Sequence, residues 1–526
     1  MPRFRTLLLA LAFALPPLAR AADAPATSKI VSVDLFKNGL AVVRREATLG
    51  KAGTYVLDDV PDAIHGTYWI DSAVPVETVV KSREVDVPQA ETAPGNLQDD
   101  LAGKKVTIHF RGEKLPPVTG TVAKFKLPKG EAAQPSRFLV VETPKGRSYV
   151  ESSEIATVEA EAGDGKVKRR RTQLLLTVGE SKQDEKAETK VVIRYLARGI
   201  TWAPSYKIDI SDPATLKLEQ HAVVKNELAD LADAEVRLIS GYPSVQFGHV
   251  TSLLSPRTGL SAFFDELGSG GGRHHALTGN GVWSQQAVMT NSRVSSPAPS
   301  LDAIPTGEGV DLHYEPIGKR TLADGDALAL TVAKGTAKYE RIVEWTVLDT
   351  RDANGRTVEG PVASDDDSPW DALRFKNPLK FPMTTGPATV VADGKFNGQR
   401  TSFWVNAGEE TVLRVDKALS VRTRSLENED AKEGNRDLIW IGGRQYRKTT
   451  VEGELTVNNH RKEAVRVAIR RRFSGDLVSA EGEPKTTLRE EGVHSVNKRN
   501  ELFWDVALKP GEERKLKYRY AVLVMH

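Results

Sequence analysis

The chain has 526 residues, of which 40% are hydrophobic and 27% are charged, with 73 Lys and Arg against 70 Asp and Glu and no cysteine. This composition is typical of a globular protein of about three or four domains. The absence of cysteine excludes disulfides, thiolate metal sites, cysteine nucleophiles and a lipid-bearing cysteine. Arg3, Arg5 and Arg20 account for the whole basic excess, so net charge gives no reason to propose a nucleic-acid partner.

The amino terminus has the pattern of a secretory signal peptide. Arg3 and Arg5 precede the apolar run Leu7–Leu18, and the sequence ARA that ends at Ala21 is a small-x-small cleavage pattern. Cleavage after Ala21 is predicted to remove residues 1–21 and to leave a periplasmic or secreted protein. An uncleaved anchor is the alternative, although the run is short for a span and contains two prolines. No later stretch approaches the roughly 20 apolar residues of a spanning helix, so no transmembrane segment is expected after cleavage.

Two small β domains are predicted after the leader. Residues 28–88 open with the alternating run KIVSVDLF, the turn residues Asn38-Gly39 and a second alternating run. Period-two alternation predicts strands, and Asn-Gly is typical of a two-residue hairpin, so this segment is predicted to be antiparallel. Residues 97–160 contain five short alternating segments separated by glycine or proline. They favour a small barrel of the SH3 or Sm kind, a fold that adds a binding module rather than catalysis.

The remaining chain has the pattern of β-sandwiches interrupted by one loop. Residues 172–258 and 310–526 alternate with period two between Asp-Gly and Pro-Gly turns, and long helical patterns with capping residues are missing. Residues 259–309 are rich in glycine, serine and proline, which predicts a flexible loop. The predicted fold class is therefore all-β, mainly antiparallel, with several β-sandwiches, a barrel-like insertion and a long disordered loop.

Several segments resemble one family of exported proteins. ARGITWAPSYKIDI contains Trp202, Pro204 and Tyr206 in the spacing of a family strand pair, and VVKNEL contributes Asn226. The segments FKNGLAVV, TGPATVVADGKFNGQRTSF and LFWDVALKPGEERKLKYRYAV are also similar to family segments and occur in the same order. On these motifs the chain resembles the mucoidy inhibitor A-like proteins, which are built around a domain of unknown function (the 4139 family).

The resemblance implies an exported, β-rich protein without known catalytic or cofactor residues. The four motif residues are therefore expected to be structural, and no cofactor is expected. The resemblance covers residues 28–88 and most of 172–526. Many family members have a long coiled coil between these parts, where this chain has residues 97–160, so a function that depends on the coiled coil is not carried over.

Candidate metal ligands are few. With cysteine absent, nitrogen ligands must come from the ten histidines. His274 and His275 are adjacent, but no further ligand is placed near them, and a polar flexible loop is the favoured interpretation. The run Asp365-Asp366-Asp367 offers oxygen ligands for calcium, yet it lacks the spacing of an EF-hand loop, so a solvated turn is favoured.

Sequence motifs for catalysis are missing. No Gly-x-Ser-x-Gly elbow, P-loop or dinucleotide fingerprint is present. Paired carboxylates are defined in space, so a glycosidase pair stays open. The tryptophans in or beside predicted strands are interpreted as core anchors rather than sugar-stacking surfaces. These are Trp202, Trp345, Trp370, Trp404, Trp440 and Trp504.

The leading hypothesis is a non-catalytic binding, scaffold or accessory protein of the cell envelope. Its partner would be an envelope protein or a cell-surface polymer, and the segment 259–309 is a candidate contact. The alternative is an envelope hydrolase or carbohydrate-processing enzyme whose acids converge only in the fold. Two facing carboxylates or a cluster with shifted pKa values would mark it. A structural surface-layer or secretion component is a third possibility, and exposed edge strands would favour it.

Overall fold

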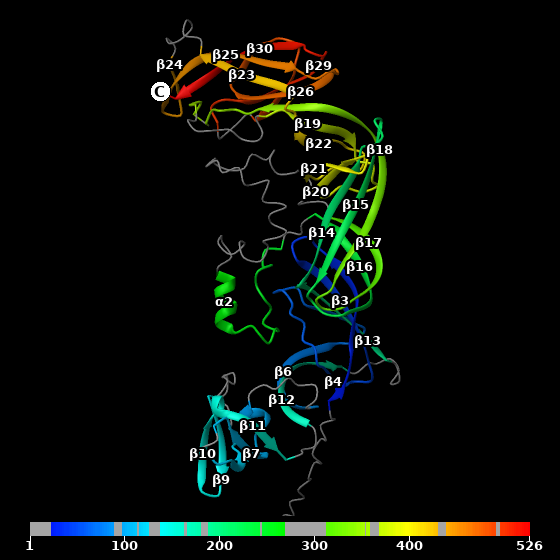
Figure 1. The fold of residues 1–526 in the computed structure, drawn as a ribbon, viewed down its shortest axis with the longest axis vertical. Helices are drawn as coiled ribbons and strands as arrows, with labels where there is room; N and C mark the ends of the chain where they lie inside the picture. Colours follow the sequence, from blue (N-terminus) through cyan, green and yellow to red (C-terminus); the bar gives the residue numbers. More distant parts are fainter. Residues whose placement is uncertain are drawn as a thin grey trace, which may run out of the picture. The chain divides into compact units, whose positions relative to one another are not determined.

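The computed structural model describes residues 23–88, 97–112, 115–125, 137–161, 166–179, 188–241, 245–268, 312–352, 354–357, 368–429, 438–490 and 495–525. In these residues nearly all regular structure is β-strand in mostly antiparallel sheets, which confirms the all-β prediction (Figure 1). The chain divides into two compact units. The first contains the described parts of residues 1–29, 45–195 and 250–267, and the second those of residues 30–44, 196–249 and 268–526.

The first unit contains a four-stranded sheet with the strand order β1-β4-β12-β6. Its strands are β1 (Ala24–Pro25), β4 (Gly53–Leu57), β12 (Lys166–Val178) and β6 (Val76–Pro88). A short strand, β5 (Trp69–Ser72), pairs with β13 (Thr189–Arg198). Helix α2 (Leu260–Gly268) buries Phe263, whose ring meets that of His65 edge-on at 4.9 Å.

The segment predicted as a barrel forms a five-stranded antiparallel sheet around its own apolar core, in the order β10-β9-β8-β7-β11. Its elements are α1 (Leu97–Asp100), β7 (Lys105–Phe110), β8 (Val118–Val122), β9 (Phe138–Thr143), β10 (Gly146–Glu151), η2 (Ser152–Glu154) and β11 (Ile155–Ala160). The turn η2 carries the chain from β10 to the free side of β7. In the described residues β10 and β11 do not pair with each other, so the sheet keeps two edges and the expected barrel is not closed.

The Asn-Gly turn lies where the sequence predicted it, between β2 (Ser28–Leu35) and β3 (Leu40–Leu49). Gly39 has a φ of 83°, which glycine adopts without strain, and the Leu40 amide donates to Asn38 Oδ1 at 3.2 Å. In the second unit β2 pairs in parallel with β16 (Leu231–Ser240), which pairs with β17 (His313–Leu322).

The second unit is organised around one long strand, β18. Its amino-terminal half pairs with β15 and its carboxyl-terminal half with β19 and β26, so it joins two layers of this unit (Figure 1). The main sheet has the order β21-β20-β14-β15-β18-β26-β29-β28. In addition, β19 pairs with both β18 and β22. These strands are β14 (Ile200–Asp209), β15 (Thr215–Asn226), β18 (Ala327–Val347), β19 (Trp370–Lys376), β20 (Gly386–Ala392), β21 (Lys395–Ser402), β22 (Glu410–Lys417), β26 (Val465–Ser474), β28 (Lys485–Glu490) and β29 (Arg499–Leu508).

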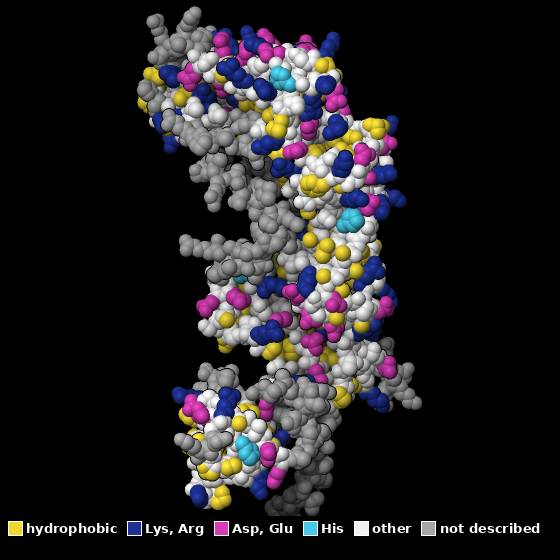
Figure 2. Space-filling model, viewed as in Figure 1, with side chains coloured by type: hydrophobic (Ala, Val, Ile, Leu, Met, Phe, Trp, Pro, Cys, Tyr) yellow, Lys and Arg dark blue, Asp and Glu magenta, His cyan; other side chains and the backbone are white. Residues whose placement is uncertain are grey.

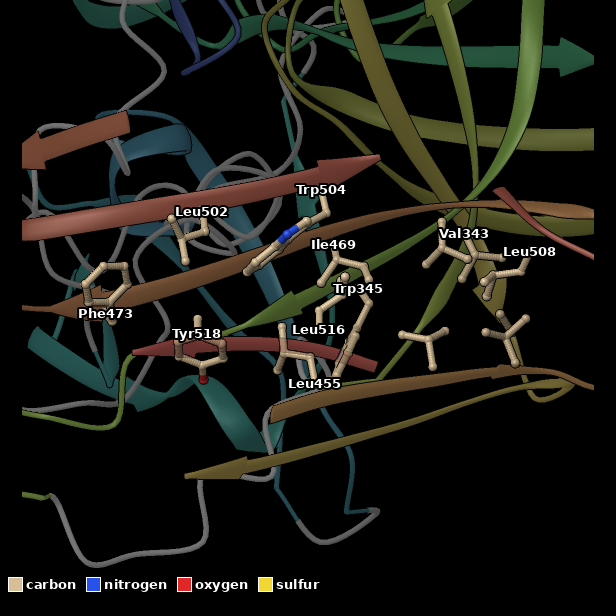
Figure 3. Packing of buried hydrophobic residues seen from close by; sticks show 14 of the residues in the cluster. Val343, Trp345, Leu455, Ile469, Phe473, Leu502, Trp504, Leu508, Leu516 and Tyr518 are labelled. Carbon is tan, nitrogen blue, oxygen red and sulfur yellow. The ribbon is translucent and has the colours of Figure 1, made fainter. Parts of the chain in front are cut away.

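A second sheet lies against β18, β26 and β29 and completes a carboxyl-terminal sandwich. Its order is β23-β25-β30-β27, with β24 added to β25. Its strands are β23 (Val421–Glu429), β24 (Leu438–Ile441), β25 (Arg444–Asn459), β27 (Asp476–Ala480) and β30 (Glu513–Met525). Figure 3 shows Trp345 alongside Leu455 and Leu516 in the core between the sheets. This core positions the candidate site.

Three buried asparagines of the second unit hold three connecting turns in the same way. Each lies at or just after a strand end and donates its side-chain amide to three carbonyls, two of which begin a turn between described strands that do not pair with each other. The glycine of that turn has positive φ and donates its N–H back to the asparagine carbonyl. The pairs are Asn226 with Gly325, Asn377 with Gly408 and Asn459 with Gly511. The repeated geometry indicates one module used three times, although the spacing in sequence is irregular.

Candidate functional site

The candidate site is built on Arg471, the middle arginine of the run Arg470-Arg471-Arg472 in β26. Successive side chains of a strand point to opposite faces, so Arg471 faces the sandwich core in line with Ile469 and Phe473. Its side chain is only 2% exposed. A buried charge needs compensation by a partner, because desolvation is costly.

Glu427 of β23 supplies that compensation. Its Oε1 accepts hydrogen bonds from Arg471 Nη2 at 2.5 Å and from Arg471 Nε at 3.2 Å. Arg471 Nη1 donates to the carbonyl of Leu348 at 2.7 Å and to the carbonyl of Arg472. The arginine thus joins β26, β23 and the chain that follows β18.

Two tyrosines of β30 complete the cluster. Tyr518 Oη lies 2.6 Å from Glu427 Oε1 and 2.8 Å from Arg471 Nε, and Tyr520 Oη donates to Glu427 Oε2 at 3.2 Å. The two rings are stacked, with centroids 6.3 Å apart. Burial raises the pKa of Tyr518 well above its ordinary value and that of Tyr520 to about 12, so both are neutral hydrogen-bond donors.

The environment keeps Glu427 charged. Burial alone would raise the pKa of Glu427, but the Arg471 charge and the hydrogen bonds from Tyr518, Arg471 and Tyr520 together lower it below its ordinary value. Arg471 stays protonated because Tyr518 and Glu427 raise its pKa despite burial. The pair is therefore a fixed ion pair rather than a proton donor and acceptor in exchange.

Asp349 is a second buried carboxylate near this pair. It accepts a hydrogen bond from Ser474 Oγ at 2.5 Å and one from the Arg351 amide at 3.1 Å. Burial raises the pKa of Asp349, and the hydrogen bond from Ser474 and the charge of Arg471 only partly oppose this. The environments of Asp349 and Glu427 thus shift their pKa values in opposite directions.

A cavity of about 390 Å³ opens beside Glu427 and Arg471. One wall is the core-facing side of β23, where Thr423, Ser425 and Glu427 lie opposite Val457, Leu455 and Gly453 of β25. Directly opposite residues of an antiparallel pair share a face, so polar side chains occupy positions that β25 fills with apolar ones or glycine. The other wall comes from β18 and the chain after it.

The motif residues found from the sequence lie in other parts of the second unit and do not line this cavity. Trp202 is buried and donates its Nε1 to the Ile239 carbonyl at 3.1 Å, and Pro204 pairs with Ala222 in the sheet. Tyr206 donates its Oη to the Thr384 carbonyl at 2.8 Å. Asn226 holds the first of the three connecting turns, between β17 and β18. These contacts stabilise strand ends and turns.

The core interpretation of the tryptophans is confirmed for five of the six and is wrong for Trp440. Trp202, Trp345, Trp370, Trp404 and Trp504 are buried, as the burial of large aromatic surface favours. Trp440 is 69% exposed because β24 is a four-residue strand at the edge of its sheet, paired with β25 alone among the described strands.

The candidate metal ligands His274, His275 and Asp365-Asp366-Asp367 lie outside the described residues, as does most of the predicted loop 259–309. The first ten residues of that segment are described, and they include α2 instead of a continuous loop. Within the described ranges no group of three or more His, Asp or Glu side chains is placed to hold a metal ion. No helix in the described part of the chain is long and apolar enough to cross a membrane.

Sequence reasoning missed Glu427, Arg471, Tyr518 and Tyr520. Their signal is weak, since these residues come from three strands, β23, β26 and β30, none of which pairs with another of the three. One feature of the sequence does point to Arg471, because it occupies a core-facing position in the alternating run VRVAIRRRF.

Comparison with known proteins places this site within one family region. No curated protein matches the chain. The family model described as Domain of unknown function (DUF4139) matches residues 191–524, which include every residue named in the cluster and its cavity wall. This match spans more than half of the sequence, so the chain belongs to the DUF4139 family.

Proposed function

We propose that this protein works by binding, as an exported scaffold or accessory factor of the cell envelope. The observation that carries the proposal is the fixed charge state of the Glu427–Arg471 pair. General acid–base catalysis needs a group whose pKa lies near the working pH and whose proton can leave. The pKa of Glu427 is lowered, and those of Tyr518 and Tyr520 are raised away from neutrality. Glu427, the carboxylate that lines the cavity, is thus suited to hold a ligand rather than to transform it.

Export to the envelope is supported by the amino-terminal pattern of two arginines, an apolar run and the ARA sequence ending at Ala21. The resemblance to mucoidy inhibitor A-like proteins points the same way. The partner would be an envelope protein or a cell-surface polymer, with the segment 259–309 as a candidate contact.

The experiment is crosslinking of the mature protein in its own envelope, followed by affinity capture and mass spectrometry. The matched control lacks residues 269–311 and keeps α2, because Phe263 of that helix is buried. We expect one dominant partner with the full chain. Capture of the same proteins by an unrelated exported β-protein would contradict a specific scaffold role.

A second candidate, an envelope hydrolase or carbohydrate-processing enzyme, is favoured by one observation. The pKa of Asp349 is raised and that of Glu427 is lowered, and carboxylates with diverging pKa values are typical of acid–base pairs. Asp349 nevertheless faces Ser474 and does not line the cavity. Reducing-end release from purified envelope polysaccharide, abolished in Asp349→Asn and Glu427→Gln, would establish the enzyme and overturn the binding proposal.

A further inference from the structure

We propose that the cavity beside Glu427 binds a compact, uncharged, polyhydroxylated ligand of about the size of one sugar ring. This inference deepens the proposed binding function and rests on it. It names the ligand class that the cavity's own residues select.

The first support is the polar inner face of β23. Thr423 is half-buried and Ser425 is exposed, and both line the cavity from the side of β23 that lies opposite Val457 and Leu455 of the apolar core. Across the cavity Thr350 adds a third hydroxyl. Hydroxyl side chains both donate and accept, which matches a ligand that carries hydroxyl groups.

The second support is the hydrogen-bonding capacity that the ion pair retains. Among the described residues, Glu427 Oε2 accepts one bond, from Tyr520, and a carboxylate oxygen accepts about two. Within the same part of the chain Arg471 Nη2 donates to Glu427 alone, which leaves one of its two N–H groups for a ligand. A ligand hydroxyl can donate to Glu427 Oε2 and accept from Arg471 Nη2 at once.

The third support is charge. Glu427 and Arg471 neutralise each other, and the other cavity-lining side chains are uncharged. A charged ligand would lose hydration without gaining an unpaired partner, so the cavity favours a neutral one.

The fourth support is the shape and polarity of the opposite wall. Trp345, Val347 and Leu348 give this wall an apolar surface. A sugar ring has C–H groups on its faces and hydroxyls at its rim, so it suits a cavity with one apolar and one polar wall. The volume of about 390 Å³ lies near the lower end of the roughly 300–1,000 Å³ of small-molecule sites. It suits one ring rather than a long chain.

The test is titration of the full mature protein with glucose and N-acetylglucosamine, followed by ligand-observed NMR and calorimetry. Glucosamine and glucuronate serve as cationic and anionic counterparts of the same size. We expect saturable binding of at least one neutral sugar and at least tenfold weaker binding of both charged ones. No saturable binding of either neutral sugar, or tighter binding of a charged one, would overturn the proposal.

Two variants test whether the ligand binds in this cavity. Ser425→Leu fills the space beside β23, and we expect it to abolish binding. Thr423→Val removes one hydroxyl at constant shape, and we expect about three- to tenfold weaker binding, the effect of one hydrogen bond. The matched control is Thr456→Val, which makes the same change on the outward face of β25. Unchanged affinity in Ser425→Leu would overturn the assignment.

Thermal unfolding of each variant separates loss of binding from loss of folding. Thr423→Val is the milder change, so it keeps the proposal testable if Ser425→Leu does not fold. Crosslinking separates this proposal from the proposed function. If Ser425→Leu captures the same envelope partner but wild type binds no sugar, the scaffold role is supported and the sugar site is refuted. If wild type instead cleaves envelope polysaccharide, the proposed function is refuted.

Discussion

The two faces of β26 use neighbouring arginines in different ways. Arg470 and Arg472 point to the outer face and share Glu501, with each hydrogen bond 3.0 Å long, and both side chains are more than a third exposed. Arg471 points inward to Glu427 and is almost fully buried. Figure 2 shows basic and acidic side chains interspersed over the strands of this region, as is typical of solvated ion pairs. Position relative to the core, rather than residue type, therefore decides what each arginine contributes.

The largest expected effect is that of Arg471→Met. Removing one partner of a buried ion pair leaves the other charge uncompensated, which costs about 3–5 kcal/mol in proteins. We expect the free energy of unfolding in urea to fall by that amount. An effect below about 1 kcal/mol would show that water or another residue compensates the charge of Glu427. The inward-facing and outward-facing arginines of β26 would then contribute similarly to stability.

The next largest expected effect is that of Glu427→Gln on the free energy of unfolding at different pH values. Because the pKa of Glu427 is lower in the folded chain than in the unfolded one, its contribution is fully present above the unfolded value of about 4.3. It is lost as the pH falls through the folded value. We expect Glu427→Gln to be less stable than wild type at pH 7 and the gap to narrow below about pH 4. Urea unfolding across this range tests the prediction, and a constant gap would contradict it.

For Asp349 we expect the opposite dependence of stability on pH. Its pKa is raised by burial, so its stabilising contribution is present below the unfolded value of about 3.9 and is lost as the pH rises through the folded value. Asp349→Asn keeps an acceptor for the Arg351 amide and carries no charge. We expect this variant to equal wild type near pH 3 and to be more stable at pH 7. Lower stability at pH 7 would refute the pKa direction.

The smallest expected effect is that of removing an arginine from the outer face of β26. Arg470 is 35% exposed, so solvent and salt screen its ion pair with Glu501, and ion pairs at the surface contribute roughly 0–1 kcal/mol. We expect Arg470→Ala to lower the free energy of unfolding by less than about 1 kcal/mol, and by still less in 1 M NaCl. A loss as large as that of Arg471→Met would abolish the distinction between the two faces.

Local patterns predicted the fold class and several turns, because period-two alternation and the Asn38-Gly39 turn depend on neighbouring residues alone. The five short strands of residues 97–160 were also predicted, whereas the pairing of β11 with β7 was not, because it is non-local. The site was missed for the same reason. Glu427 and Arg471 meet only when β23 and β26 lie in facing sheets, and no local rule specifies which strands will do so.

The most direct test of the account is the titration of the Glu427 side-chain carboxyl by carbon-13 NMR, assigned with Glu427→Gln. Binding without acid–base chemistry requires this carboxylate to stay charged throughout the neutral range, because Arg471 and two tyrosines stabilise its charge. We predict a titration below the ordinary glutamate value of about 4.3 and no further change up to pH 8. A titration near neutrality would give the cavity an exchangeable proton, contradict the binding account and favour the hydrolase.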